Sequence, residues 1–231
     1  MKPSAAAKVF DLECRACPRL AGFLDEVREA RPTYFCKPVP PFGDARAGLV
    51  IVGLAPGMHG ANRTGRPFTG DHAGILLYQT LHEYGFASHA GSSEPDDGLE
   101  LIDCRITNAV KCLPPQNKPE PAEIRQCNGF LAAELAAHPP KAVLALGLIA
   151  HQAVLRSRGL KVKDFVFAHH AVHELPASGD GVHAAPAVRL YDSYHCSRYN
   201  TQTRRLTPAM FQAVFSDIRQ FLGPHSGRRT P

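Results

Sequence analysis

Short apolar runs alternate with longer amphipathic stretches along most of this chain. Residues 49–52, Leu-Val-Ile-Val, form a β-branched run between glycines, typical of a strand buried on both faces of a parallel sheet. Similar runs predict strands at residues 101–107, 142–146 and 187–191. Stretches with helical spacing lie between them. This alternation predicts one doubly wound α/β domain with a mostly parallel, four-stranded sheet.

Five stretches have the periodicity of amphipathic helices. The first covers residues 9–30, the second covers 75–84, and the fourth follows the third strand through about Leu155. Pro121 stands where the first turn of a helix tolerates proline. Thr207 is expected to cap the last helix. The core side of that last helix consists of Phe211, Val214, Phe215, Ile218 and Leu222.

Three unusual loops each follow a predicted strand, at residues 53–71, 108–118 and 194–206. The carboxyl ends of parallel strands meet at one edge of the sheet, where open α/β folds bind ligands. We therefore expect the three loops to share one cleft. The alternative is that they are only polar connections between elements.

Composition supports an ordinary globular protein. The chain has 231 residues, 44% hydrophobic and 20% charged, which suits a single domain spanning 1–231 with tails at about 1–8 and 223–231. The formal net charge of +5 and the 12 histidines favour polyanionic partners mildly. The longest apolar stretch, 142–150, is shorter than the roughly 20 residues that cross a bilayer. No secretory signal begins the chain, so a cytoplasmic location, with no membrane partner, is expected.

Four of the seven cysteines form two pairs, Cys14-x2-Cys17 and Cys112-x14-Cys127. Two such pairs supply the four thiolates that tetrahedral iron or zinc sites need. The 14 residues between Cys112 and Cys127 match no standard zinc-finger spacing, which favours an iron–sulfur cluster. The alternative is one chance pair and two structural cysteines. Of the other three, Cys104 lies inside a predicted strand and is expected in the core.

The first loop combines a tight turn with an aromatic and a carboxylate. Residues 53–57, Gly-Leu-Ala-Pro-Gly, expose backbone N–H groups to a phosphate or a base edge. Farther along, Phe68 precedes Asp71 by three residues, so a planar ligand stacked on the ring would bring its reacting centre to the carboxylate. Alternatively, Phe68 anchors the core and Asp71 caps the next helix.

The other two loops carry polar side chains suited to a nucleotide. Asn108 has one acceptor and two donor hydrogens, enough to read a pyrimidine edge, unless it caps a turn. His195 is placed to donate a hydrogen bond to an oxygen gaining negative charge, although a lone loop histidine is often only solvated. The phosphate-binding candidates beside it are Ser197, Arg198 and Asn200.

Four motifs occur together in this chain: GLAPG at 53–57, GRPFTGD at 65–71, TNAVKC at 107–112 and HCSRYNTQTRRLTP at 195–208. With the four cysteines, this combination resembles the uracil-DNA glycosylase superfamily, and most closely its type b, or family 5, branch. The resemblance extends from Cys14 to Leu222. It implies a three-layer α/β/α sandwich around a four-stranded parallel sheet. It also implies a 4Fe-4S cluster on Cys14, Cys17, Cys112 and Cys127.

The resemblance implies an enzyme that hydrolyses the bond between deoxyribose and uracil, or another deaminated or modified base, in DNA. Its first motif carries the inert Leu54 and Ala55 where narrower branches have an acidic or amide side chain, so catalytic help must come from elsewhere. The implied catalytic residues are Asp71, Asn108 and His195. The implied base-binding residues are Gly53, Leu54, Ala55, Phe68 and Asn108.

Roles for these residues follow from the reaction. Phe68 would stack on the base, Asn108 would bind its edge, and His195 would donate to the departing base oxygen. Asp71 would orient water or stabilise the cationic sugar. The residues expected to contact DNA are Ser197, Arg198, Asn200 and Arg204. The expected partner is double-stranded DNA containing uracil or other deaminated bases, bound by a monomer associated with the nucleoid.

Two other functions fit the same features. A metal-stapled nucleic-acid-binding module without turnover would keep the basic loop and the thiols. An enzyme of free nucleosides or nucleotides would keep the cleft and show little salt dependence. Cleavage of a uracil-containing oligonucleotide separates both from a DNA glycosylase.

Overall fold

Four parallel strands form the centre of the sheet. In the computed structural model, which describes residues 10–177 and 186–224, these are β2 (Leu49–Gly53), β3 (Cys104–Asn108), β4 (Ala142–Leu146) and β6 (Val188–Ser193). They lie in the order β3-β2-β4-β6, and every residue of β2 and β4 is buried. All four predicted strands are present. The expected tails, residues 1–8 and all of 223–231 beyond Pro224, lie outside the described residues.

The four-stranded sheet of the prediction is wrong in its strand count, because two short antiparallel strands extend the edges. β1 (Phe42–Gly43) pairs with β3, and β5 (Val172–Leu175) pairs with β6, giving a mixed six-stranded sheet. β1 has only 2 residues, and β5 buries only its last residue. Neither strand therefore has the continuous apolar run by which buried strands are found in a sequence.

Seven α-helices occur within the described ranges. They are α1 (Pro18–Ala30), α2 (Ala61–Thr64), α3 (His72–Glu83), α4 (Pro121–Ala137), α5 (Leu148–Ser157), α6 (Arg198–Gln202) and α7 (Pro208–Leu222). Two 3-10 turns, Pro115–Asn117 and Val162–Asp164, complete the list. Thr207 caps α7 as expected, its side chain accepting from the Met210 N–H at 3.2 Å.

The boundaries of three elements differ from the expectation. α1 begins at Pro18 and not at residue 9, so Cys14 lies in the preceding loop and Cys17 at the N-cap position. Proline lacks the N–H of a helix interior and suits the first turn. β3 begins at Cys104 and not at 101, because Asp103 has a left-handed backbone (φ 50°). α3 begins three residues earlier than expected, at His72.

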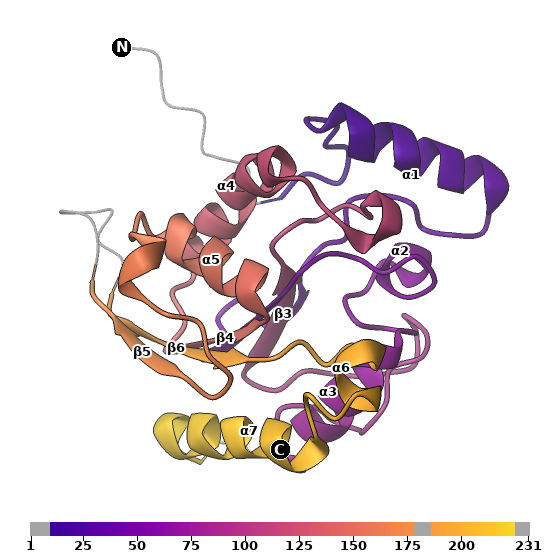
Figure 1. The fold of residues 1–231 in the computed structure, drawn as a ribbon. Coiled ribbons are helices and arrows are strands. Elements are labelled where there is room, and N and C mark those ends of the chain that lie inside the picture. Colours follow the sequence, from indigo (N-terminus) through magenta and orange to yellow (C-terminus); the bar gives the residue numbers. More distant parts are fainter. Residues whose placement is uncertain (1–9, 178–185, 225–231) are drawn as a thin grey trace.

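Helices cover both faces of the sheet, which gives the three layers that the family resemblance implies. α4 and α5 lie on one face, and α3 and α7 lie on the other (Figure 1). The first face packs Leu131 and Val154 against Val143 of β4. The second packs Leu77 and Phe215 against Leu144 of the same strand. Alternate residues of β4 therefore serve opposite cores, as the period of two in a strand requires.

α1 packs outside these layers, beside α4 (Figure 1). Leu20 and Leu24 of α1 join Ile124 and Cys127 of α4 in a third apolar cluster. Two of the four paired cysteines, Cys112 and Cys127, are also part of this cluster. None of the helices in the described ranges is long and apolar enough to span a bilayer.

Candidate active site

A cavity of about 710 Å³ opens at the carboxyl ends of the parallel strands. Loops that follow β2, β3, β4 and β6 contribute to its lining, so residues distant in sequence meet there. This is the shared cleft that the loop positions predict. The candidate residues that line it are Leu54, Ala55, Phe68, Asp71, Asn108, His195, Ser197 and Arg198.

Three candidates do not line the cleft. Gly53 lies beneath it, where a Cβ atom would meet the Phe68 ring at 2.7 Å and would overlap Asn108 Oδ1. The Asn200 amide donates to the His195 carbonyl oxygen at 2.8 Å, so it holds the histidine's backbone in place. Arg204 is exposed in the turn after α6.

Phe68 lies both in the core and in the wall of the cleft, so the two interpretations of the sequence are compatible. It is 6% exposed and belongs to the apolar cluster beneath α3. Its ring stacks on His195, with centroids 5.8 Å apart and an interplanar angle of 27°. The left-handed backbone at Phe68 (φ 56°) is costly for a bulky residue and is typical of functional sites.

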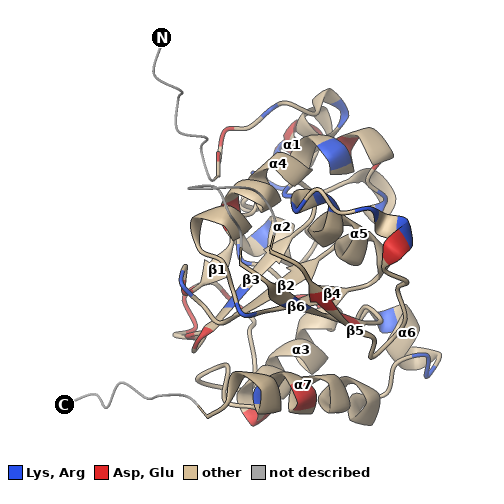
Figure 2. Cartoon of the chain, turned by 90° about the vertical axis from the view of Figure 1, so that its left-hand side faces the viewer, with Lys and Arg blue, Asp and Glu red and all other residues tan. Residues whose placement is uncertain are grey.

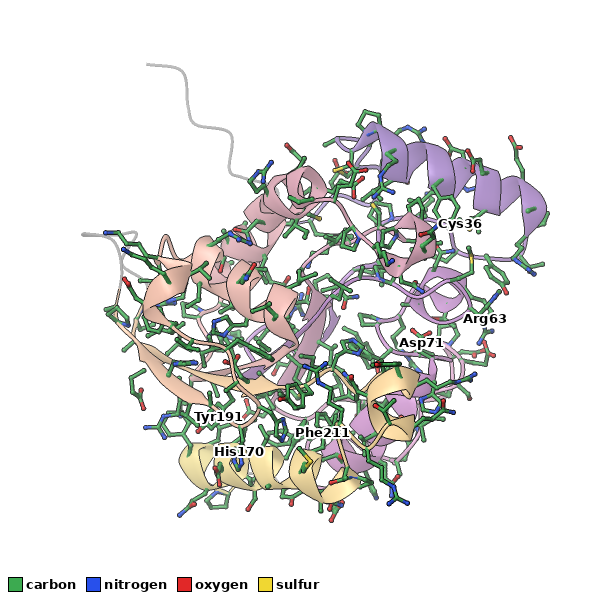
Figure 3. All side chains as sticks on the ribbon, viewed as in Figure 1. Cys36, Arg63, Asp71, His170, Tyr191 and Phe211 are labelled. Atoms are coloured by element: carbon green, nitrogen blue, oxygen red, sulfur yellow. The ribbon has the colours of Figure 1, made fainter. Side chains whose placement is uncertain are left out.

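Asp71 occupies the N-cap position of α3, but within the described residues its side chain makes no capping hydrogen bond. Figure 3 shows it between α2 and α6. The nearest donor is the Ala61 N–H, 3.4 Å from Oδ2. A Cβ atom at Gly57 would approach Oδ1 to 2.6 Å, and one at Gly60 would overlap the carboxylate. Backbone atoms of Gly57, Gly60 and Ala61 therefore lie against one side of the carboxylate, which also lines the cleft.

Burial also changes the acid–base properties of Asp71 and His195. Loss of solvation raises the pKa of Asp71, and the Ala61 N–H opposes that shift. Burial lowers the pKa of His195 to about 4. Each side chain keeps part of its surface exposed, but protein atoms surround both closely. At neutral pH the site therefore contains a neutral imidazole and a carboxylate with greater affinity for a proton than usual.

Asn108 ends β3 and is paired in register with Gly53 of β2. The residue is 4% exposed, and its Oδ1 is buried without a hydrogen-bond partner among the described residues. A buried carbonyl oxygen without a donor costs free energy of about 1–3 kcal/mol. An N–H group of a ligand in the cleft would satisfy it.

Further residues of the cleft were missed from the sequence. His72 lines it beside Asp71, and its Nδ1 is buried without a partner in the described part of the chain. Asn117 and Leu148 also line the cleft. His72 and Leu148 are the first residues of α3 and α5. The helical pattern marks such positions only as helix boundaries and gives no sign that they line a cleft.

A second hollow of about 590 Å³ adjoins the cleft. The two share Asp71, His72 and Arg198, and the second is also lined by Ser92 and Ser93. Figure 2 shows basic positions in α6 and in the turn after it, where the sequence carries Arg198, Arg204 and Arg205. A chain-like ligand can thus pass from one hollow to the other beside a basic segment.

The four paired cysteines line one small cavity between α1 and α4. Burial, and after it the neighbouring sulfurs, raises the pKa of Cys17 and raises the pKa of Cys112 to about 12. Cys127 Sγ accepts the Lys111 N–H at 3.3 Å. Such crowded thiols suit bound cationic metal.

The four thiols lie farther apart than the most compact group of metal-ligating side chains. Among the described residues, only His151, His173 and Asp192 form a group of three metal-ligating side chains within 4.8 Å of one another. Zinc bound at about 2.3 Å from each sulfur would draw the thiolates closer together than that. The four thiols therefore share one cavity without forming such a close group in the described residues. Cys104, which is not one of these four, is fully buried in the core as predicted.

Comparison with known proteins identifies the family. Residues 40–219 match the family model described as "Uracil DNA glycosylase superfamily". The chain belongs to this superfamily. A Thermus thermophilus protein named "Type-5 uracil-DNA glycosylase" is 44% identical over 216 residues, which cover 91% of this chain and 94% of that protein.

Two further uracil-DNA glycosylases are similar to this chain. A Mycobacterium leprae protein with the same type-5 name is 42% identical over 219 residues, covering 91% of this chain and 92% of that protein. An Archaeoglobus fulgidus "Type-4 uracil-DNA glycosylase" is 28% identical over 200 residues, covering 84% and 87%. These matches confirm the family resemblance that the motifs indicate, and the alignment with the Thermus thermophilus protein covers 91% of the chain.

Proposed function

We propose that this protein is a DNA repair glycosylase that hydrolyses the N-glycosidic bond of uracil and other deaminated bases in DNA. The observation that carries the proposal is the cleft: a stacking ring, an unpartnered buried acceptor, a neutral histidine and a buried carboxylate meet there. Relatives named type-5 uracil-DNA glycosylase support it.

The proposed substrate enters by base flipping, because a base stacked in duplex DNA cannot reach the cleft. Extrusion costs a few kcal/mol and costs less for a mismatched base, so uracil opposite guanine should be preferred. The flipped base stacks on Phe68. Asn108 Oδ1 accepts a hydrogen from the base edge, which satisfies the orphan oxygen.

Two charges develop as the bond breaks, and the cleft has a group for each. The departing base becomes anionic, and the neutral His195 ring donates a hydrogen bond to its oxygen. The sugar becomes cationic, and Asp71 is the carboxylate among the described lining residues that stabilises it or orients the attacking water. The side chains of Leu54 and Ala55 supply only apolar contact, so among the lining side chains these two charge interactions carry the reaction.

The proposed cofactor is a 4Fe-4S cluster held by Cys14, Cys17, Cys112 and Cys127. When bound, it supplies structural cross-linking, because its ligands come from the loop before α1, the loop after β3 and from α4. Replacing Cys14 by serine is expected to lower iron content and Tm together. Soluble Cys14→Ser protein with no iron and full activity would contradict the structural role.

Arg198 and Ser197 are the proposed contacts to the DNA backbone, since both line the cleft. Arg204 is the proposed outer contact, and Asn200 supports His195 from behind. We infer that the protein binds double-stranded DNA as a monomer. The apolar interior of the cleft and the basic segment beside it suit a base and a phosphate backbone respectively.

The test is a glycosylase assay on duplexes that contain uracil, hypoxanthine or xanthine. Strand scission after alkali is expected for wild-type protein, with a loss of about 10²- to 10⁴-fold in Asp71→Asn. Asparagine has nearly the size of aspartate, so the substitution removes the charge without disturbing the packing, and any loss of activity reflects the missing carboxylate. A gel shift without scission would identify a non-catalytic DNA binder, and turnover of free nucleosides would identify the third function considered above.

A further inference from the structure

A buried cluster of two histidines and one carboxylate lies outside the cleft. His151 comes from α5, His173 from β5 and Asp192 from β6. His151 Nδ1 lies 2.8 Å from Asp192 Oδ1, and His173 Nε2 lies 3.1 Å from Asp192 Oδ2. The side chains of His151 and Asp192 are 0% exposed, and that of His173 is 16% exposed. The reaction proposed above uses none of the three.

The hydrogen bonds of His151 reveal an imbalance in this cluster. Its Nε2 lies 3.0 Å from the Phe165 carbonyl oxygen, which can only accept, so Nε2 carries a hydrogen. In a neutral ring, Nδ1 then has a lone pair, and that lone pair faces the Asp192 carboxylate. Two acceptors at this distance require a cation between or beside them.

Asp192 has the same requirement. It is a fully buried carboxylate, and its ion-pair partners among the described residues are the two histidines, with no lysine or arginine. Burial of a carboxylate without a countercharge is expensive. A single proton on His151 would also balance the pair, with a neutral His173 donating its Nε2–H to Oδ2; a metal ion would instead bind a lone pair of each ring.

We propose that His151, His173 and Asp192 bind one divalent transition-metal ion of the zinc class. Their donor atoms lie within 4.8 Å of one another. Tetrahedral zinc at about 2.0–2.1 Å from nitrogen and oxygen places its donors about 3.4 Å apart, so the nitrogen–oxygen pairs at 2.8 and 3.1 Å need to open only slightly to admit the ion. Two imidazoles with one carboxylate favour zinc over magnesium, which prefers oxygen ligands.

The surroundings of His151 match those of metal-bound histidines. Such rings donate their second N–H to a carbonyl or carboxylate, which fixes the nitrogen that binds the ion. The Phe165 carbonyl performs this function here. The Phe167 ring packs edge-on against His151 at 5.6 Å and the Phe165 ring against His173 at 5.8 Å, so apolar walls enclose the site.

The ion would join three elements behind the active site. Asp192 precedes His195 by three residues, on the strand whose end carries that histidine. α5 begins at Leu148, which lines the cleft. Metal binding would therefore stabilise the frame of the cleft without touching substrate, and the proposal stands whether or not the protein proves to be a glycosylase.

Metal counting on the iron-loaded protein tests the proposal. After equilibration with zinc chloride and desalting, one zinc per chain is expected with iron content unchanged. Zinc that replaces the cluster would instead appear as a matching loss of iron. With free zinc about a hundredfold above its dissociation constant, Tm should rise by roughly 5–10 °C for a chain of this size.

Two variants make the test specific. His173→Gln should lose the zinc and the rise in Tm while keeping its iron. His170→Gln is the matched control, because His170 lies three residues away and bonds to Asp217 instead. Zinc content equal in wild type and His173→Gln would overturn the proposal and leave a proton as the cation.

A measurement on wild-type protein alone guards against a variant that fails to fold. Cadmium-113 replaces zinc and has an NMR shift that distinguishes nitrogen and oxygen ligands from thiolates. A resonance from a nitrogen-and-oxygen site is expected in iron-loaded protein. Its absence, or a thiolate resonance only, would overturn the proposal.

Discussion

Asp71 is the residue whose surroundings depart most from those expected of its position. At an N-cap, aspartate ordinarily accepts from the first turn of its helix. Here the carboxylate lies instead against the backbone of Gly57, Gly60 and Ala61, with one long contact at 3.4 Å. Weak hydrogen bonding and burial leave a carboxylate that favours protonation more than usual. Such a group is suited to act on a developing cation or on a water molecule.

The raised pKa of Asp71 predicts the pH dependence of the reaction. The ionised form is the active one, so kcat/KM should fall as the pH drops through a pKa above the ordinary 3.8 of aspartate. His195, with a pKa of about 4, stays neutral from pH 8 to 5 and adds no second step there. A pH–rate profile of wild-type protein checks this, and an acid limb at or below the ordinary value would contradict it.

Gly60 offers a test of how the carboxylate is placed. A Cβ atom at this position overlaps the Asp71 carboxylate, so Gly60→Ala must displace it. Since misplacement of about 1 Å costs roughly 10²-fold, we expect a drop of that order in kcat with Tm nearly unchanged. Gly91→Ala is the control, because its Cβ meets nothing within 4 Å. Equal activity of the two variants would show that Asp71 tolerates movement.

Sequence alone could not choose between Asp71 as a cap and Asp71 as a reacting group. Both interpretations require the same residue at the same position before α3, and the difference lies in where the side chain points. That direction is set by Gly57 and Gly60, which approach only in the folded chain. Asn108 is similar, because only the structure shows that its buried oxygen has no partner in the described residues.

At the scale of elements, a buried ionic network fixes α4 to β3 beneath the cysteine loop. Glu134 of α4 accepts from Arg105 Nε at 2.8 Å and from Thr107 Oγ1 at 3.0 Å, and pairs with Lys111 Nζ at 3.3 Å. Lys111, 1% exposed, immediately precedes Cys112. The network therefore fixes the position of Cys112, a candidate cluster ligand, relative to both β3 and α4.

Removing the carboxylate of this network should be severe. Glu134→Ala leaves the buried Lys111 and the half-buried Arg105 without their common partner, which typically costs about 3–5 kcal/mol. Chemical denaturation measures the loss. The control is Glu174→Ala, which removes an exposed pair with Arg189 and should cost at most about 1 kcal/mol. Similar losses in both variants would mean that the buried network contributes little.

Elements with a strong apolar period were predictable, and those without one were not. β4 is buried throughout and was found with its bounds intact at 142–146. β5 alternates exposed and half-buried positions and pairs at an edge, so its register depends on β6 and not on its own pattern. The late start of α1 at Pro18 is set by proline chemistry and the preceding cysteine loop, which the apolar spacing does not report.

At the scale of the whole molecule, parallel pairing brings the site together. β2, β3, β4 and β6 run the same way, so the loops after them meet on one edge although they span residues 54 to 198. This convergence follows from the alternation of strands and helices and was predictable without side-chain detail. The second hollow was not, because residues 88–98 that help form it contain no regular element.

The position of Arg198 predicts how the molecule binds DNA. It is exposed and lines both hollows, the place where a strand would leave the cleft. Each phosphate contact contributes about 0.9 to the slope of log affinity against log salt concentration. Arg198→Ala should therefore flatten that slope by about one and weaken binding at low salt for all sequences alike.

The matched control is Arg46→Ala. Arg46 is equally exposed but precedes β2, so it lies at the amino edge of the sheet, away from the cleft. Its removal lowers the net charge by the same amount, which separates a local contact from general attraction of a basic protein for DNA. Salt titrations of both variants on a uracil-containing duplex decide the matter. If the two slopes change equally, α6 is not part of the DNA-binding surface, and the strand leaves the cleft by another route.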